Sequence, residues 1–170
     1  MVDLRSLFVE TADIPWVVGL SGGKDSTAVT MHMLETLESL PPPVRRRKRC
    51  YVTCVNTLVE APPVIDHVHL FIAALRTYVR DRDLPVEVVE LTPEVDQTFW
   101  VNLIGRGYPT PVREFRWCTD RMKIRPQQRF IQENTEVFGD PPVVHFLLGT
   151  RFDESASRQR TMEAHSRMGT

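Results

Sequence analysis

The chain has 170 residues, of which 42% are hydrophobic and 25% are charged, and its formal net charge is -1. This length suffices for one ordinary hydrophobic core and not for two large domains, so we expect a single domain over residues 1–170. A net charge so close to zero gives no overall field that would recruit nucleic acid or an anionic membrane. No apolar run has the length of a membrane span, the first residues lack the apolar centre of a signal peptide, and the three cysteines include no Cys-x-x-Cys pair. We therefore expect a cytoplasmic protein without a disulfide framework.

The most informative stretch is the loop at residues 21–26, with the sequence Ser-Gly-Gly-Lys-Asp-Ser. It follows a short apolar run at residues 16–20 and precedes an amphipathic pattern, an order that is typical of strand, tight turn and helix. The loop is then a helix N-terminus with unpaired N–H groups and partial positive charge. Adjacent glycines bring these amides close to a ligand, the serine hydroxyls and the lysine favour phosphate, and the aspartate suits Mg²⁺. The loop predicts a nucleoside triphosphate site at Ser21, Gly22, Gly23, Lys24, Asp25 and Ser26, with Asp25 holding Mg²⁺.

This loop is not a Walker A loop, because no earlier glycine stands at the required spacing before Lys24. A serine-glycine turn that only connects two elements is the plainer interpretation. Such a turn needs neither the lysine nor the Asp-Ser pair, so we favour the phosphate site.

Residues 27–91 predict further helices and strands in alternation. The first helix ends near Leu40, where three prolines follow, and a basic run at residues 45–49 is expected on a loop as solvated surface or as a nucleic-acid backbone contact. Residues 50–55 predict a buried strand, a helix begins at residue 62 or 63, and residues 85–91 alternate as a third strand. Because ligands bind where parallel strands end, the polar residues after the second strand are candidates for nucleotide or substrate contact: Asn56, Thr57 and Glu60. For Asn56 and Thr57, helix capping is the other interpretation.

A strongly basic segment runs from residue 106 to residue 129, after a helix expected over residues 93–106 with Phe99, Trp100, Leu103 and Ile104 on its buried face. Within the segment itself the acidic residues are Glu114 and Asp120 alone, and aromatic residues are interleaved with the basic ones. Guanidinium groups and aromatic rings can hold phosphates and stack bases, so we predict a substrate surface here. Its members are Arg113, Arg116, Arg121 and Lys123. Cys118 lies among these cations, which favour a thiolate.

Residues 143–148 form a last apolar run, followed by a glycine and a polar turn. This repeats the order of strand, glycine turn and helix expected around residues 21–26. The interpretation as a second phosphate site competes with simple helix capping by Asp153 or Ser155. The predicted phosphate contacts are Gly149, Thr150, Arg151 and Arg158.

Five blocks of sequence in this order carry a resemblance to a known family: residues 21–26, 56–63, 99–109, 115–119, and 149–151 with Glu154 and Ser155. They resemble the sulfurtransferase of bacterial DNA phosphorothioation, of the DndC or SspD type, within the ATP pyrophosphatase superfamily that also holds the adenylyl-sulfate reductases. The loop at residues 21–26 is similar to the motif that cradles the β- and γ-phosphates in that superfamily.

The resemblance implies an α/β fold of the adenine-nucleotide α-hydrolase (HUP) type, with three layers and a mainly parallel sheet of about five strands. It implies cleavage of ATP to AMP and pyrophosphate with Mg²⁺, which activates the DNA backbone for sulfur, with Lys24, Asp25 and Arg151 as catalytic residues. DNA, a cysteine desulfurase and other phosphorothioation proteins are the implied partners, and an oligomer is possible. In longer relatives four cysteines hold an iron-sulfur cluster, of which Cys118 would match the first, so sulfur or cluster chemistry is expected at Cys118.

Three other functions stay open on the sequence. An adenylyl-sulfate reductase would use the same fold to attack sulfur, but its Glu-Cys-Gly segment is absent. A tRNA thiolase would show paired cysteines, which this sequence lacks. A non-catalytic nucleotide-binding scaffold would bind ATP without releasing AMP.

Overall fold

The sheet of this protein is parallel and lies between helices. A computed structural model describes residues 3–11, 13–112 and 115–150. Within them four strands, β1 (Trp16–Leu20), β2 (Cys50–Val55), β3 (Val86–Leu91) and β4 (His145–Leu148), form one sheet in the order β3-β2-β1-β4, and every neighbouring pair is parallel. The predicted α/β class with a parallel sheet is confirmed. The described residues contain four of the roughly five strands expected.

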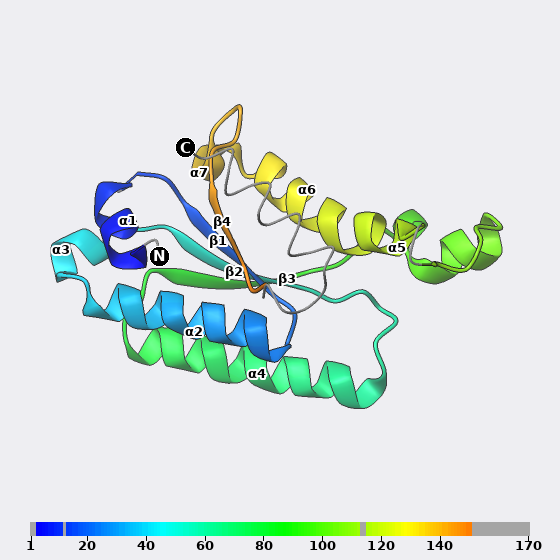
Figure 1. The fold of residues 1–170 in the computed structure, drawn as a ribbon, viewed down its shortest axis with the longest axis horizontal. Helices are drawn as coiled ribbons and strands as arrows, with labels where there is room; N and C mark the ends of the chain where they lie inside the picture. Colours follow the sequence, from blue (N-terminus) through cyan, green and yellow to red (C-terminus); the bar gives the residue numbers. More distant parts are fainter. Residues whose placement is uncertain (1–2, 12, 113–114, 151–170) are drawn as a thin grey trace.

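Helices cover both faces of the sheet (Figure 1). The long helices α2 (Lys24–Ser39) and α4 (Pro62–Asp81) lie side by side on one face, and α6 (Arg125–Glu133) crosses the other. The short helices α1 (Leu4–Glu10) and α3 (Pro42–Arg45) lie near the beginning of the strands, and α7 (Thr135–Phe138) precedes β4. The molecule therefore has the three layers expected of it. None of the described helices is long and apolar enough to cross a membrane.

The hydrophobic core lies mainly between the sheet and the α2–α4 layer. Helix α4 buries Val68, Ile72, Leu75 and Val79, whose spacing of three or four residues makes one helical face. Strand β1 is buried along almost its whole length, as expected for a central strand covered on both sides. This packing fixes the carboxyl ends of β1 and β2 relative to the first turn of α2.

The basic run at residues 45–49 is only partly surface. Arg46, Arg47 and Arg49 are exposed, but Lys48 is buried and its ammonium group donates a hydrogen bond to the carbonyl of Phe8. Burial lowers the pKa of Lys48 below its ordinary value. The prediction of a solvated run is therefore wrong for Lys48, because its long stem reaches the end of the core beside α1.

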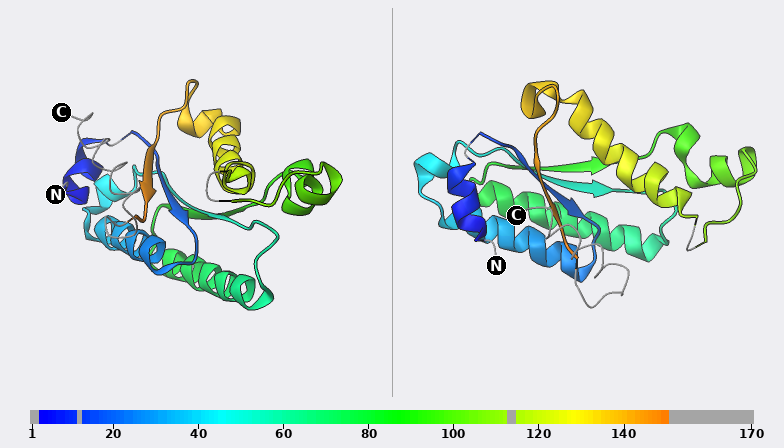
Figure 2. Two further views of the ribbon diagram at one scale, coloured as in Figure 1. Left: turned by 45° about the vertical axis from the view of Figure 1, so that its right-hand side comes forward. Right: turned by 45° about the horizontal axis from the view of Figure 1, so that its top comes forward.

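Residues 95–112 and 115–124 form an irregular unit beyond the carboxyl end of β3 (Figure 2). It contains a 3₁₀ turn, η1 (Val95–Gln97), two π-helical turns, η2 (Val101–Gly105) and η3 (Asp120–Ile124), and a short helix, α5 (Trp117–Thr119). The expected regular helix over residues 93–106 is wrong, and so is part of its predicted buried face. Trp100 and Ile104 are 57% and 75% exposed, while Asn102 is fully buried. Polar contacts of Asn102, and not an apolar stripe, organise this unit.

Candidate functional site

The loop between β1 and α2 has the geometry predicted for a phosphate loop. Gly22 has φ of +75°, a conformation that side chains disfavour, and a Cβ there would lie 2.8 Å from Cγ2 of Val68. Gly23 is the N-cap of α2 and provides no side chain to cap the helix. Lys24 and Asp25 follow as the first two residues of α2. The first N–H groups of this 16-residue helix therefore have no side-chain cap and lie beside a lysine, an arrangement that favours an anion.

Ser26 braces this loop from inside. Its hydroxyl donates to the carbonyl of Gly23 at 2.9 Å and accepts from the N–H of Ser21 at 3.1 Å. The two serine hydroxyl oxygens lie 3.0 Å apart, and Ser26 is buried while Ser21 is exposed. Because the Ser26 proton goes to Gly23, Ser21 donates in the contact between the two hydroxyls, and both serine protons are used within the loop.

Gly149, which directly follows β4, packs closely against the first turn of α2. A Cβ on Gly149 would lie 2.6 Å from the carbonyl carbon and oxygen of Asp25 and from the nitrogen of Ser26. Only glycine allows so close an approach between two backbones. The residues after β4 and the first turn of α2, which lie far apart in the sequence, are thereby joined into one wall.

A crevice of about 440 Å³ opens at this wall, where β1, β2 and β4 end. This is the position at which open parallel sheets bind ligands, next to the point where the strand order reverses between β1 and β4. The described residues that line it are Gly19, Leu20, Ser21, Ser26, Val55, Glu60, Thr119, Lys123, Gln127, Leu148, Gly149 and Thr150.

One wall of the crevice comes from three residues, of which the sequence analysis singled out only Lys123 as a site residue. Thr119, Lys123 and Gln127 are four residues apart and form one face of the helical stretch that runs from α5 through η3 into α6. The carboxamide oxygen of Gln127 accepts from the hydroxyl of the buried Thr53 at 3.4 Å. The four-residue spacing of Thr119, Lys123 and Gln127 was the signal in the sequence that could have identified this face. Only Lys123 was predicted as a site residue.

The loop after β2 presents Glu60 to the crevice and keeps Asn56 and Thr57 behind it. Neither Asn56 nor Thr57 caps α4, whose N-cap is Ala61, so the capping interpretation is wrong. Asn56 instead accepts from the N–H of Leu58 at 3.0 Å, and the buried Thr57 donates to Oε1 of Glu60 at 2.9 Å. Direct contact of Asn56 and Thr57 with a nucleotide remains a prediction.

Several arginines of the basic segment form ion pairs with carboxylates, more than the sequence of the segment indicates. The guanidinium of Arg106 contacts Asp96 at 2.9 Å, that of Arg125 contacts Asp120 at 2.8 Å, and Arg129 contacts Glu94 at 2.9 Å. Two of these acidic residues, Glu94 and Asp96, precede the segment in the sequence. Their pairing with its arginines could not be seen from the sequence of the segment alone. Much of the positive charge is therefore compensated locally.

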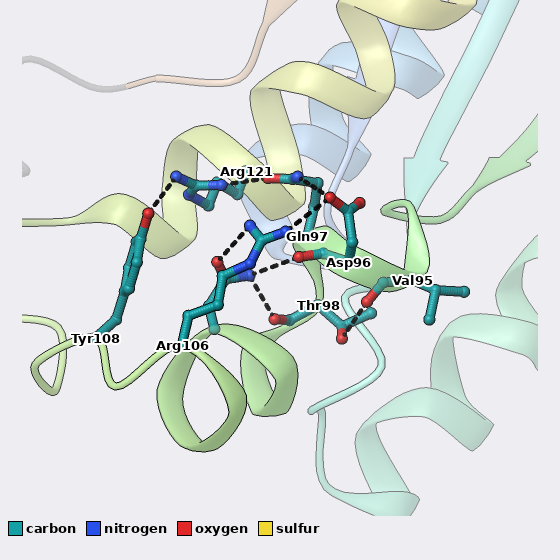
Figure 3. A network of polar contacts seen from close by, with 8 residues as sticks. Val95, Asp96, Gln97, Thr98, Arg106, Tyr108 and Arg121 are labelled. Atoms are coloured by element: carbon teal, nitrogen blue, oxygen red, sulfur yellow. Dashed lines mark hydrogen bonds and ion pairs between the residues drawn. The ribbon is translucent and has the colours of Figure 1, made fainter.

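Arg121 is also engaged internally (Figure 3). Its guanidinium donates to the hydroxyl of Tyr108 at 2.7 Å and to the side-chain oxygen of Gln97. Arg116 is exposed, Lys123 is exposed and lines the crevice, and neither forms an ion pair with a described residue. Arg113 lies outside the described residues. Of the predicted substrate surface, Arg116 and Lys123 are thus the described members with an available charge.

The irregular unit contains an aromatic cluster around Trp117 and a half-buried thiol at Cys118. Trp117 stacks on Phe99 with ring centroids 5.4 Å apart, and its indole N–H donates to the carbonyl of Pro109 at 2.9 Å. The next residue, Cys118, is half-buried, and Thr119 rather than Cys118 lines the crevice. Cys118 is next in sequence to a residue that lines the crevice, and its predicted sulfur chemistry remains a prediction.

The described residues do not fit an iron-sulfur cluster by themselves. Cys50 and Cys54 are buried in β2, where burial raises their pKa to about 12 and about 11, while Cys118 is in α5. No three Cys, His, Asp or Glu side chains gather into a metal-holding group within residues 3–11, 13–112 and 115–150. For Mg²⁺ the fit is better, because Asp25 offers a hard oxygen beside a phosphate site and the nucleotide and water supply the other ligands. Arg151 and Arg158 lie outside the described residues.

Comparisons with known proteins give partial matches. No protein-family model matches the chain. It is 28% identical over 151 residues to the uncharacterized protein MJ0066 of Methanocaldococcus jannaschii, a stretch that covers 89% of this chain and 26% of that protein. Among solved structures it is similar to the U34-tRNA thiolase NcsA from Methanococcus maripaludis with its 4Fe-4S cluster, with a TM-score of 0.48 and 17% identity over 95% of this chain and 49% of that one. The chain spans about a quarter of the curated relative and about half of the solved one.

Proposed function

We propose that this chain binds ATP with Mg²⁺ in the crevice and cleaves it between the α- and β-phosphates to give AMP and pyrophosphate. The contact of Gly149 with the first turn of α2 carries this proposal, because it brings two phosphate-compatible backbone turns to one wall of a 440 Å³ crevice. The β- and γ-phosphates would lie on residues 21–26, near the unpaired amides and Lys24. A polyphosphate so placed leaves its α-phosphate over the open crevice, where an acceptor can attack.

The chemistry needed is mostly positioning and neutralisation of charge. The N–H groups at the start of α2 and the ammonium of Lys24 would stabilise the negative charge that builds up on the departing pyrophosphate. Mg²⁺, when bound, neutralises phosphate charge, and Asp25 is the residue that would hold it. Attack on the α-phosphorus by an oxygen of the acceptor or of water displaces pyrophosphate and leaves the adenylate.

We further propose that the acceptor is a phosphate oxygen of the DNA backbone, in a DNA phosphorothioation system. A sulfur nucleophile supplied by a cysteine desulfurase would then attack the adenylated DNA phosphorus and displace AMP. The resemblance of the five sequence blocks supports this finer assignment, and Lys123 and Arg116 are the described cations with charge available for a phosphodiester.

Incubation with ATP labelled at the α-phosphate, with and without DNA, tests the proposal. AMP and pyrophosphate should form, and ADP alone as product would contradict it. Lys24→Ala and Asp25→Ala should each remove most of this turnover. Their melting temperatures should stay near that of the unaltered chain, because Lys24 is exposed, Asp25 is only partly buried, and neither belongs to the core. Melting many degrees lower would show that these residues are structural.

A further inference from the structure

Glu60 is the one carboxylate among the described residues that line the crevice. Its Oε1 is held by a hydrogen bond of 2.9 Å from the hydroxyl of Thr57, whose side chain is 1% exposed and therefore fixed. No described residue donates to Oε2. Glu60 is exposed, but its hydrogen bond to Thr57 orients the carboxylate and leaves acceptor capacity at Oε2.

The loop that carries Glu60 is itself held in shape. Asn56 accepts from the N–H of Leu58 at 3.0 Å and donates to Oε1 of Glu90 on β3 at 3.2 Å. Leu58 has φ of +63°, a conformation that a leucine adopts only when its surroundings impose it. The polar residues after β2 therefore serve to place Glu60 at the crevice.

A fixed negative charge in a crevice for a triphosphate must avoid the phosphates, so its partners are neutral hydroxyl donors or a cation. The phosphate loop follows β1, whereas Glu60 follows the adjacent β2, on the side of β1 away from β4. In the dinucleotide-binding folds, which also place a phosphate loop after the first strand, a carboxylate after the adjacent strand accepts a hydrogen bond from a ribose hydroxyl. Glu60 has the corresponding place in this sheet.

We propose that Glu60 accepts hydrogen bonds from the ribose hydroxyls and makes the crevice selective for ribonucleotides over deoxyribonucleotides. The inference rests on the proposed binding of ATP. It gives Glu60 a role in specificity and makes Thr57 the residue that positions it. Such selection would matter for a protein whose acceptor is DNA. The crevice would then accept the ribose of ATP and discriminate against the deoxyribose of the acceptor strand.

The test compares the binding of α,β-methylene-ATP and its 2′-deoxy form in the presence of Mg²⁺. We expect the ribonucleotide to bind about tenfold more tightly to the unaltered chain, the effect of one hydrogen bond to a charged acceptor. Glu60→Ala should bind both analogues alike. Glu87→Ala, a change at an exposed carboxylate on β3 outside the crevice, should keep the tenfold preference. Thr57→Val should lose part of the preference, and Thr57→Ser, which retains the hydroxyl, should restore it.

The contrary results separate this inference from the proposed function. Equal binding of the two analogues by the unaltered chain would overturn ribose selection, while AMP formation from ATP would still stand. If Glu60→Ala weakened both analogues equally and raised the Mg²⁺ concentration needed for binding, Glu60 would be a metal ligand and the inference would be wrong. Failure of the unaltered chain to bind either analogue would overturn both proposals.

Discussion

Among the three thiols, burial decides which one can react. Burial raises the pKa of Cys50 to about 12 and that of Cys54 to about 11, so neither forms the thiolate that alkylation requires near neutral pH. Cys118 is half-buried and precedes Thr119, which lines the crevice. Iodoacetamide at pH 8 should therefore add one label per native chain, found at Cys118 by peptide mass spectrometry. Cys118→Ser should take up none until the chain is unfolded in urea, and early labelling of Cys50 or Cys54 would contradict the buried placement of β2.

Gly149 is the glycine whose replacement should damage the site most directly. A methyl group there would lie 2.6 Å from backbone atoms of Asp25 and Ser26, which cannot yield without moving the phosphate loop. We expect Gly149→Ala to lower the free energy of unfolding by about 1–3 kcal/mol, as overpacking does, and to weaken ATP binding. Gly105→Ala is the matched control, because its new methyl group would meet its nearest neighbour, Val101, at 3.8 Å. Equal effects in thermal melts and in calorimetry would remove the special role of Gly149.

At the scale of elements, the unit over residues 95–112 and 115–124 depends on polar contacts (Figure 3). The side-chain amide of Asn102 donates to the carbonyl of Thr98 at 2.8 Å, and Arg106 donates to Asp96 at 2.9 Å and to Asn102 at 3.4 Å. Such a network does not show up as periodicity of apolar residues, which is why a regular helix was expected here. The same unit contains Thr119 and Lys123, which line the crevice.

The Asp96–Arg106 contact gives this unit a pH dependence of known sign. The hydrogen bond from Arg106 lowers the pKa of the Asp96 carboxyl below its ordinary value. A carboxyl with a lowered pKa in the folded state stabilises the fold above its unfolded pKa, and the contribution is lost as pH falls through the folded value. The protection factors of the amides in residues 95–106, which correct for the intrinsic pH dependence of exchange, should therefore fall in acid more than those of β1. In Asp96→Asn this extra acid sensitivity should disappear, and its persistence would assign it to another carboxyl.

At the scale of the whole molecule, the sequence predicted the elements whose patterns are local. Residues 16–20 and 50–55 are strands as expected, and the loop between the first strand and its helix has the expected geometry because glycine content and helix position are both readable from sequence. Helix α6 and the partners of the arginines were not predicted, since Arg129 meets Glu94 only after the chain has folded back. Glu60 was a candidate from its position, but its orientation depends on Thr57.

The paired arginines also change which residues should govern DNA binding. Each cation that neutralises a phosphate releases counterions and contributes about 0.9 to the slope of log affinity against log salt. Arg116 and Lys123 form no ion pair with a described residue, whereas Arg125 and Arg129 contact Asp120 and Glu94. Replacing both Arg116 and Lys123 by Gln should therefore flatten the slope for duplex DNA by about two. Replacing Arg125 and Arg129 by Gln should change it little, because those guanidiniums already have carboxylate partners. If the second pair of changes flattened the slope and the first did not, the DNA surface would lie along α6 and away from the crevice.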